Sequence, residues 1–486
     1  MEDNNKYYKS RHFQRLLHRY EKAVSEGHVP YLEADELTDI AEYYMTGKQD
    51  AKANQAIRAA INMHPDSVDP QIFLARQKMF YGQLKEAKDI VDNITEQEDI
   101  EVIYLKAELL LSENRATEAS DYLLGQMELV QDSTEDYFYD CTRIFMDYDQ
   151  WELAEEWLEQ FKDNNPTHPH LPFMEAEIQM GLDNYEGALP KLLEIVDNEP
   201  YDSEAWNLLA ETYIALEKYP EALEATDDAL AINPQDNNAL LLKANAYMHD
   251  EQMAVAIEHY TKYPKAQPDD LGAQISLALC LTNEERYKEV MPLLDKAEQY
   301  AKKLPGRETD LPQIYQVRAF TLSHLGRTND ALATLAKARE LVDDSLKWKC
   351  DLSEADIYLH TGQTKKAENL FASALEKSPE QGDTLFNIAL TYSNAGYNDV
   401  AINLLEDVWT IFGTQEGKFV VPYLANCYLK KNDMDNFLGY LKLAPFCDRK
   451  ATMYLFRDRF PDIAPEDYYA YAYKEVYGIF PPAQES

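Results

Sequence analysis

Residues 203–236 read SEAWNLLAETYIALEKYPEALEATDDALAINPQD, and this stretch of 34 residues decides the fold. Trp206, Leu209 and Tyr213 recur at helical spacing, so they share one face of a first helix. Ala222 falls on a second helix, where a small side chain lets two helices cross closely. A proline near the end of the stretch stops the second helix, because it lacks the amide hydrogen that a helix interior needs. The stretch therefore predicts two helices joined by a short turn.

Small residues repeat with this period along almost the whole chain. Two columns, all alanine except for one threonine, run in step at intervals of mostly 34 residues. The first column consists of Ala41, Ala75, Ala107, Thr142, Ala176, Ala210, Ala244, Ala278, Ala319, Ala355, Ala389 and Ala425. The second consists of Ala53, Ala87, Ala119, Ala154, Ala188, Ala222, Ala256, Ala331, Ala367 and Ala401. Columns that keep a common spacing indicate stacked repeats, each burying its apolar face against its neighbours.

The repeat resembles the tetratricopeptide repeat family, whose pattern is W-x2-L-G-x2-Y followed by A, F, A and P. The residues of 203–236 that carry the resemblance are Trp206, Leu209, Ala210, Tyr213, Ala222, Thr226, Ala229 and Pro234. The resemblance implies an all-α fold, a right-handed superhelix of about 12 helix-turn-helix repeats with helical caps. The acidic, tyrosine-rich composition is also similar to that of uncharacterised bacterial members of the family.

The expected organisation has five parts. We expect an amphipathic capping helix in 1–33, repeats 1–8 in 34–302, an inserted loop or hinge in 303–311, repeats 9–12 in 312–450, and an aromatic-rich cap in 451–486. The insertion explains one interval of 41 residues in the first column, and its Pro-Gly dipeptide is typical of turns. The alternative role for the basic N-terminal helix is an arm that binds an acidic partner or a membrane surface.

The chain is strongly acidic, with 87 Asp and Glu against 46 Lys and Arg and a net charge of −41. Such a field repels nucleic acid and anionic lipid and favours neutral or basic protein partners, although solubility alone is the other explanation. The sequence carries neither an apolar leader nor 18 consecutive apolar residues, so no membrane insertion is expected. Five scattered cysteines suit a reducing compartment, and we expect a cytoplasmic protein.

The resemblance also implies where a partner binds. In this family the first helix of each repeat lines a concave groove, and the inward positions here carry mainly aromatic, methionine and asparagine side chains. The residues expected to contact a peptide are Tyr104, Tyr139, Arg143, Met146, Phe173, Met174, Asn207, Glu211, Leu241, Asn245, Phe386, Asn387, Asn394 and Asn426. Aromatic and methionine side chains supply adaptable contact area, and asparagine hydrogen-bonds an extended backbone. The alternative is that many of them only pack between adjacent repeats.

We therefore expect a protein–protein interaction scaffold that holds an extended peptide or a partner helix in the groove. The alternatives are a chaperone-like module for unfolded or nascent chains and a docking or regulatory subunit of an enzyme complex. No GxSxG, HExxH or phosphate-binding motif occurs, so neither enzyme activity nor a cofactor or metal ion is expected.

Two pairs of histidines have spacings of interest. His168 and His170 lie in a proline-rich turn without nearby cysteine, which is a weak metal signal. His324 and His360 map to the same inward position of repeats 9 and 10. These two are expected to be polar lining residues, and the alternative is a pair that binds a metal ion or senses pH.

Overall fold

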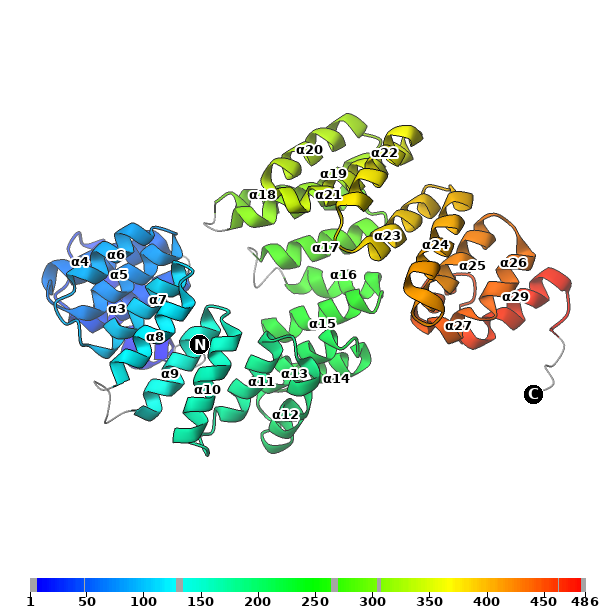
Figure 1. Ribbon diagram of the computed structural model, residues 1–486. Helices are drawn as coiled ribbons and strands as arrows, with labels where there is room; N and C mark the ends of the chain where they lie inside the picture. Colours follow the sequence, from blue (N-terminus) through cyan, green and yellow to red (C-terminus); the bar gives the residue numbers. More distant parts are fainter. Residues whose placement is uncertain are drawn as a thin grey trace. The chain divides into compact units, whose positions relative to one another are not determined.

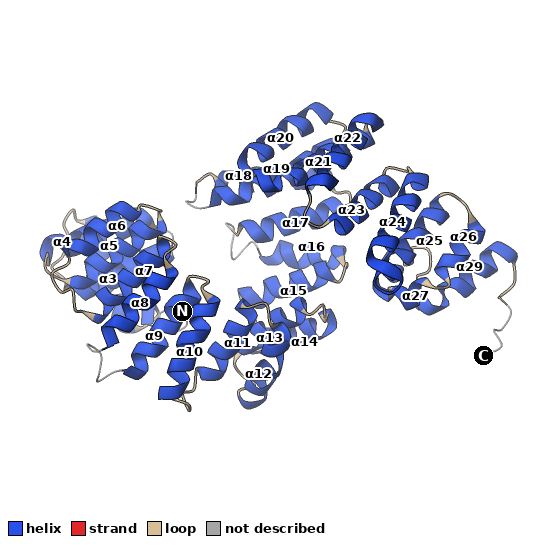
Figure 2. Ribbon diagram, in the orientation of Figure 1, coloured by secondary structure: helices blue, strands red, loops and turns tan. Residues whose placement is uncertain are grey.

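The chain is built from helices that follow one another as pairs joined by short turns (Figure 1). The described part of the chain contains no β-strand (Figure 2). None of its helices is long and apolar enough to span a membrane. The computed structural model describes residues 7–47, 49–127, 134–263, 270–303, 307–461 and 463–481.

Contacts between Cα atoms divide the chain into two compact units, Met1–Leu242 and Lys243–Ser486. In the first unit, one helix, α2 (Arg11–Ser25), precedes six helix pairs. These pairs are α3 (Ala34–Thr46) and α4 (Asp50–Met63), α5 (Val68–Phe80) and α6 (Leu84–Asn93), α7 (Ile100–Ser112) and α8 (Ala116–Gln126), α9 (Thr134–Asp147) and α10 (Trp151–Asn164), α11 (Leu171–Gly181) and α12 (Tyr185–Asn198), and α13 (Ser203–Ala215) and α14 (Tyr219–Ile232).

Six more helix pairs and three short helices follow. The boundary between the two units, after Leu242, falls inside the first helix of the first of these pairs. The pairs are α15 (Asn237–His249) and α16 (Met253–Lys262), α17 (Leu271–Asn283) and α18 (Tyr287–Ala301), α19 (Leu311–His324) and α20 (Thr328–Leu341), α21 (Lys347–His360) and α22 (Thr364–Lys377), α23 (Gln381–Asn394) and α24 (Asn398–Glu416), and α25 (Val421–Lys430) and α26 (Met434–Leu441). The last helices are α27 (Ala444–Cys447), α28 (Arg449–Phe456) and α29 (Tyr468–Tyr477). Twelve pairs in the described residues confirm the all-α fold of about 12 helix-turn-helix repeats.

The two small-residue columns lie where helices cross. Every member of both columns is buried, with at most 1% of its surface exposed. The one polar member, Thr142, is satisfied because its hydroxyl donates a hydrogen bond of 2.7 Å to the Phe138 carbonyl oxygen. Val290 is fully buried in the eighth pair, where the second column lacks an alanine. The predicted close contact between helices is therefore present.

In the described residues, the turns of eleven pairs each contain one residue with a positive φ angle. In eleven described pairs this φ lies between 55° and 86°, at Gly82, Asn114, Asp149, Asp183, Glu217, Glu251, Glu285, Gly326, Gly362, Gly396 and Asn432. After the turn, the next amide reaches back along the first helix, as when the Lys218 amide donates to the Tyr213 carbonyl at 2.8 Å. Glycine adopts this conformation freely, whereas glutamate adopts it at a cost of about 1 kcal/mol.

The N-terminal helix and the end of the expected insertion both pack against neighbouring helices. Phe13, Leu17 and Tyr20 of α2 are buried in one cluster with Leu37 and Ile40 of α3. In the expected insertion 303–311, residues 304–306 lie outside the described residues. The following residues form a short 3-10 helix, η3 (Arg307–Asp310), which contacts both α18 and α19.

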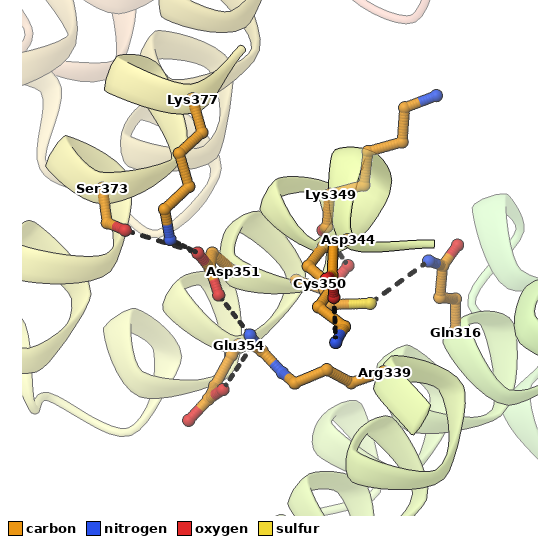
Figure 3. A network of polar contacts seen from close by, with 11 residues as sticks. Gln316, Arg339, Asp344, Lys349, Cys350, Asp351, Glu354, Ser373 and Lys377 are labelled. Carbon is orange, nitrogen blue, oxygen red and sulfur yellow. Dashed lines mark hydrogen bonds and ion pairs between the residues drawn. The ribbon is translucent and has the colours of Figure 1, made fainter. Parts of the chain in front are cut away.

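A buried ionic network joins three helices of the second unit (Figure 3). Asp351 of α21 is only 3% exposed, and it accepts a hydrogen bond from Arg339 of α20. From α22, Ser373 Oγ and Lys377 Nζ donate to the same carboxylate at 3.4 and 3.3 Å. Arg339 also donates to Glu354 at 2.9 Å. The charges of this network neutralise one another, so its role is structural.

Candidate functional site

A groove runs along the face formed by the first helices of the first four pairs, α3, α5, α7 and α9. It begins as a hollow of about 560 Å³, lined by Tyr8, Asp35, Thr38, Asp39, Glu42, Met45, Thr46, Asp69, Ile72, Phe73, Arg76, Gln77, Phe80 and Glu101. A second hollow of about 410 Å³ is lined by Arg76, Glu101, Tyr104, Glu108, Asp140, Arg143, Ile144, Asp147 and Tyr148. Arg76 and Glu101 line both hollows, so the two hollows adjoin, and together they are called the acidic groove below.

Carboxylates greatly outnumber cations in the acidic groove. Five line the first hollow and four line the second, with Glu101 common to both, so eight carboxylates face two arginines. Both arginines are already paired within the chain. Arg76 donates two hydrogen bonds of 2.9 and 2.7 Å to Glu108, and Arg143 donates one of 3.2 Å to Glu177. The negative charge of the groove is therefore largely uncompensated.

The uncompensated charge is concentrated at the N-terminal end. Among the described residues, Asp35, Asp39 and Asp69 have no ion pair. Burial raises the pKa of the Asp39 carboxyl, and repulsion from Asp35 and Asp69 raises it further. Burial likewise raises the pKa of the Glu42 carboxyl, with Asp39 adding to the shift. These carboxylates are stabilised by any cation that enters the groove.

Arg76 separates this end from the second hollow. Burial opposes its charge, but hydrogen bonds and attraction from Glu108 keep the pKa of its guanidinium above the ordinary value. Glu108 is only 9% exposed, so the bidentate pair is a fixed part of the wall. Burial also raises the pKa of the Glu101 carboxyl even though Arg76 acts to lower it.

Tyrosine hydroxyls hold part of the acidic wall in place. Tyr7 and Tyr8, just before α2, donate to Asp39 and Glu42 respectively, the second bond being 3.3 Å long. In the second hollow Tyr104 donates to Asp140 at 3.0 Å. The segment before the N-terminal helix thus contributes directly to the groove.

Apolar side chains line the same hollow as the carboxylates. Ile72 and Phe73 of α5 face it together with Met45 of α3. Phe80, at the end of α5, is 67% exposed and is accessible to a partner. The groove therefore offers apolar contact area beside negative charge.

The structure places the expected peptide-contacting residues in several different settings. Tyr104 and Arg143 line the acidic groove. Met146, Met174 and Asn207 are buried, at 6%, 1% and 6% exposure. The side chains of Arg143, Tyr139, Phe173, Leu241, Asn245, Phe386 and Asn426 are half-buried, and those of Glu211, Asn387 and Asn394 are exposed.

Several of these residues have partners inside the protein. Tyr139 packs on His168 and on Phe161, with ring centroids 5.4 and 5.8 Å apart. Asn207 donates to Asp236 at 3.1 Å. Further contacts join Asn245 to the Tyr260 hydroxyl and Phe386 to the rings of Phe419 and Tyr423.

The residues expected to contact a peptide include none of the eight carboxylates of the acidic groove, although Glu108 maps to an inward position. These expected contacts begin at the third repeat, where aromatic and methionine side chains dominate the inward positions. A usable signal existed, since Glu42, Arg76, Glu108 and Arg143 each directly follow a member of the first small-residue column.

The chain has similarity to proteins of known structure. No curated protein matches the chain. Among solved structures, a tetratricopeptide repeat protein from Parabacteroides merdae is 17% identical, with a TM-score of 0.39 over 53% of this chain and 98% of that one. The Cut9–Hcn1 hetero-tetramer of the APC/C is 13% identical, with a TM-score of 0.35 over 88% and 96% of the chains. YrrB, a TPR protein with an unusual peptide-binding site, is 19% identical, with a TM-score of 0.32 over 40% and 95%.

A family model links part of the sequence to a named repeat. Residues 179–246, which include the stretch of 34 residues quoted first, match the tetratricopeptide repeat model. The same helix-turn-helix pair occurs on both sides of the matched segment. These observations are consistent with a protein of the tetratricopeptide repeat family.

Proposed function

We propose that the chain is a protein–protein interaction scaffold whose acidic groove binds a basic, extended segment of a partner protein. The excess of eight carboxylates over two internally paired arginines carries this proposal. Burial, and then repulsion from neighbouring carboxylates, raises the carboxyl pKa values of Asp39 and Glu42, and lysine or arginine side chains entering the groove offset both effects.

The apolar side chains that line the groove indicate that the partner segment also carries apolar side chains. Phe73 and the exposed Phe80 lie in the same hollow as Asp39 and Asp69. A segment that carries basic side chains alternating with apolar ones satisfies both surfaces at once. Because the groove crosses four successive first helices, an extended segment fits it better than a single side chain does.

The test compares peptides of equal length that alternate leucine with either lysine or glutamate. Fluorescence anisotropy measures their binding to the full chain and to the double variant Asp39→Asn, Asp69→Asn. A matched control, Asp89→Asn, Asp121→Asn, removes the same charge from exposed positions on second helices, outside both hollows.

The lysine peptide is expected to bind and the glutamate peptide is not. Two lost charge pairs of about 0.7 kcal/mol each raise the Kd for the lysine peptide about tenfold in the groove variant. The control variant is expected to bind as the original chain does. If both variants lose affinity equally, the net charge of −41 attracts the peptide without the groove, and the proposal fails.

A further inference from the structure

Two histidines of the second unit lie side by side on successive first helices. His324 is the last residue of α19 and His360 the last residue of α21, and these two helices contact each other. The ring centroids are 5.2 Å apart, with the ring planes at 52°. Both residues are exposed, and 29% of the His360 side-chain surface is accessible, so small solutes reach the pair.

The hydrogen bonds of both rings leave the same nitrogen free. His324 Nδ1 donates to the Phe320 carbonyl oxygen at 3.1 Å, and His360 Nδ1 donates to the Asp356 carbonyl oxygen at 3.0 Å. Since a carbonyl only accepts, each Nδ1 carries the hydrogen and each neutral ring keeps a lone pair on Nε2. No described residue bonds either Nε2. A metal-binding histidine commonly shows this arrangement, with Nδ1–H held by a carbonyl or a carboxylate.

Neighbouring groups hold both rings in place. The Asp356 carboxylate lies 3.0 Å from His360 Nδ1. Phe320 and Tyr287 flank the His324 ring, with centroids 4.1 and 5.2 Å away. A carboxylate behind an imidazole orients the ring and increases the basicity of its free nitrogen.

The spacing of the rings fits a shared metal ion. A metal–nitrogen bond is about 2.0–2.1 Å long, and a ring centroid lies about 1.2 Å beyond its nitrogen. Two imidazoles on one tetrahedral ion therefore have centroids about 5 Å apart. The 5.2 Å between the two rings matches this value.

A surface hollow lies next to residues that contact the pair, although neither histidine lines it. A hollow of about 200 Å³ is lined by Phe320, Leu352, Ser353, Asp356, Ile357 and Thr391. It shares Phe320 and Asp356 with the environment of the two rings. Among the described residues, no group of three or more His, Cys, Asp or Glu could hold a metal ion, so an ion at this pair would have no more than two ligands from them.

We propose that His324 and His360 together bind one divalent transition-metal ion through their Nε2 atoms. The ion is of the class that prefers imidazole, namely Ni²⁺, Cu²⁺ or Zn²⁺. The remaining coordination positions are open to water or to a donor atom of a bound partner.

The chain offers a matched control in its other close histidine pair. The rings of His168 and His170 are 5.5 Å apart, nearly the same distance. However, His168 Nδ1 accepts a hydrogen bond of 3.3 Å from the His170 amide. Its lone pair is therefore already used, and the hydrogen lies on Nε2.

The test is a calorimetric titration of the full chain, without a histidine tag, with Ni²⁺. Cu²⁺ paramagnetic resonance at one equivalent identifies the ligand atoms. We expect one tight equivalent of Ni²⁺ and a copper spectrum with nitrogen hyperfine structure. His324→Ala and His360→Ala each weaken binding more than about tenfold, whereas the double variant His168→Ala, His170→Ala keeps it.

Two results overturn the proposal. One is unchanged Ni²⁺ binding in the His324→Ala, His360→Ala double variant. The other is a copper spectrum that shows oxygen ligands only, which places the ion on surface carboxylates. Because both histidines are exposed, the variants are expected to fold, and circular dichroism checks this directly.

Discussion

Removing charge from the acidic groove is expected to stabilise the protein while weakening its binding function. The change is the double variant Asp39→Asn, Asp69→Asn, which preserves side-chain size and the acceptor atom for the Tyr7 hydroxyl. In the free protein, burial raises the pKa of both carboxyls, and repulsion from neighbouring carboxylates raises it further. Neutralising them removes an unfavourable interaction from the folded state.

The size of the effect follows from the local environment. Asp69 is exposed and Asp39 half-buried, so each interaction is partly screened and contributes about 0.5 kcal/mol. The two changes together add about 1 kcal/mol to the free energy of opening this part of the chain. Native-state hydrogen exchange of the α3 and α5 amides is then slower by about fivefold.

The sign of this change separates two explanations of the carboxylates. If they exist to bind a cationic segment, peptide affinity falls as the exchange rates of α3 and α5 fall. If they instead stabilise the fold, the variant opens more easily and exchange becomes faster. Faster exchange, or faster proteolysis within 34–80, refutes the reasoning.

Other predictions concern pH, turns and the buried network. Because the folded-state pKa values of Asp39 and Glu42 are raised, the folded chain binds protons before the unfolded one does, and thermal stability should increase as the pH falls from 7 towards 5. Glu217→Gly should stabilise the chain by about 0.5–1 kcal/mol and Gly362→Ala should destabilise it by about 1 kcal/mol in urea unfolding, because both residues have a positive φ. Asp351→Ala should destabilise α20–α22 by about 2 kcal/mol, seen as faster hydrogen exchange there, because it leaves Arg339 with a single carboxylate partner.

The sequence was sufficient to predict the helix pairs because one physical requirement recurs. Crossing helices need a small side chain at contact, and that need produces columns of alanine that are readable without any structure. The positive-φ turn position was also readable, since it always lies seven residues after a member of the first column. The residue types alone do not mark it, because Glu217, Glu251 and Glu285 are not residues that favour a positive φ.

The acidic groove was harder to predict for a different reason. Among 87 carboxylates, a cluster has no signature in the sequence alone. Whether Glu108 is neutralised or free depends on the Arg76 side chain, which reaches it from the neighbouring helix across 32 residues of sequence. Such pairing is set by the distance between helices, and the residue types do not reveal it.

The position directly after each member of the first column differs in residue type between the two units. In the first unit this position is charged, as at Glu42, Arg76 and Glu108. In the second unit it carries Leu279 and Phe320, which are 37% and 38% exposed, and then Asp356 behind His360. In both units these positions lie on the first helix of the same kind of helix pair, so the two units differ there in side chains and not in backbone fold. A cationic segment for the first unit and a metal ion for the second are therefore independent proposals, and Asp39→Asn should leave Ni²⁺ binding unchanged.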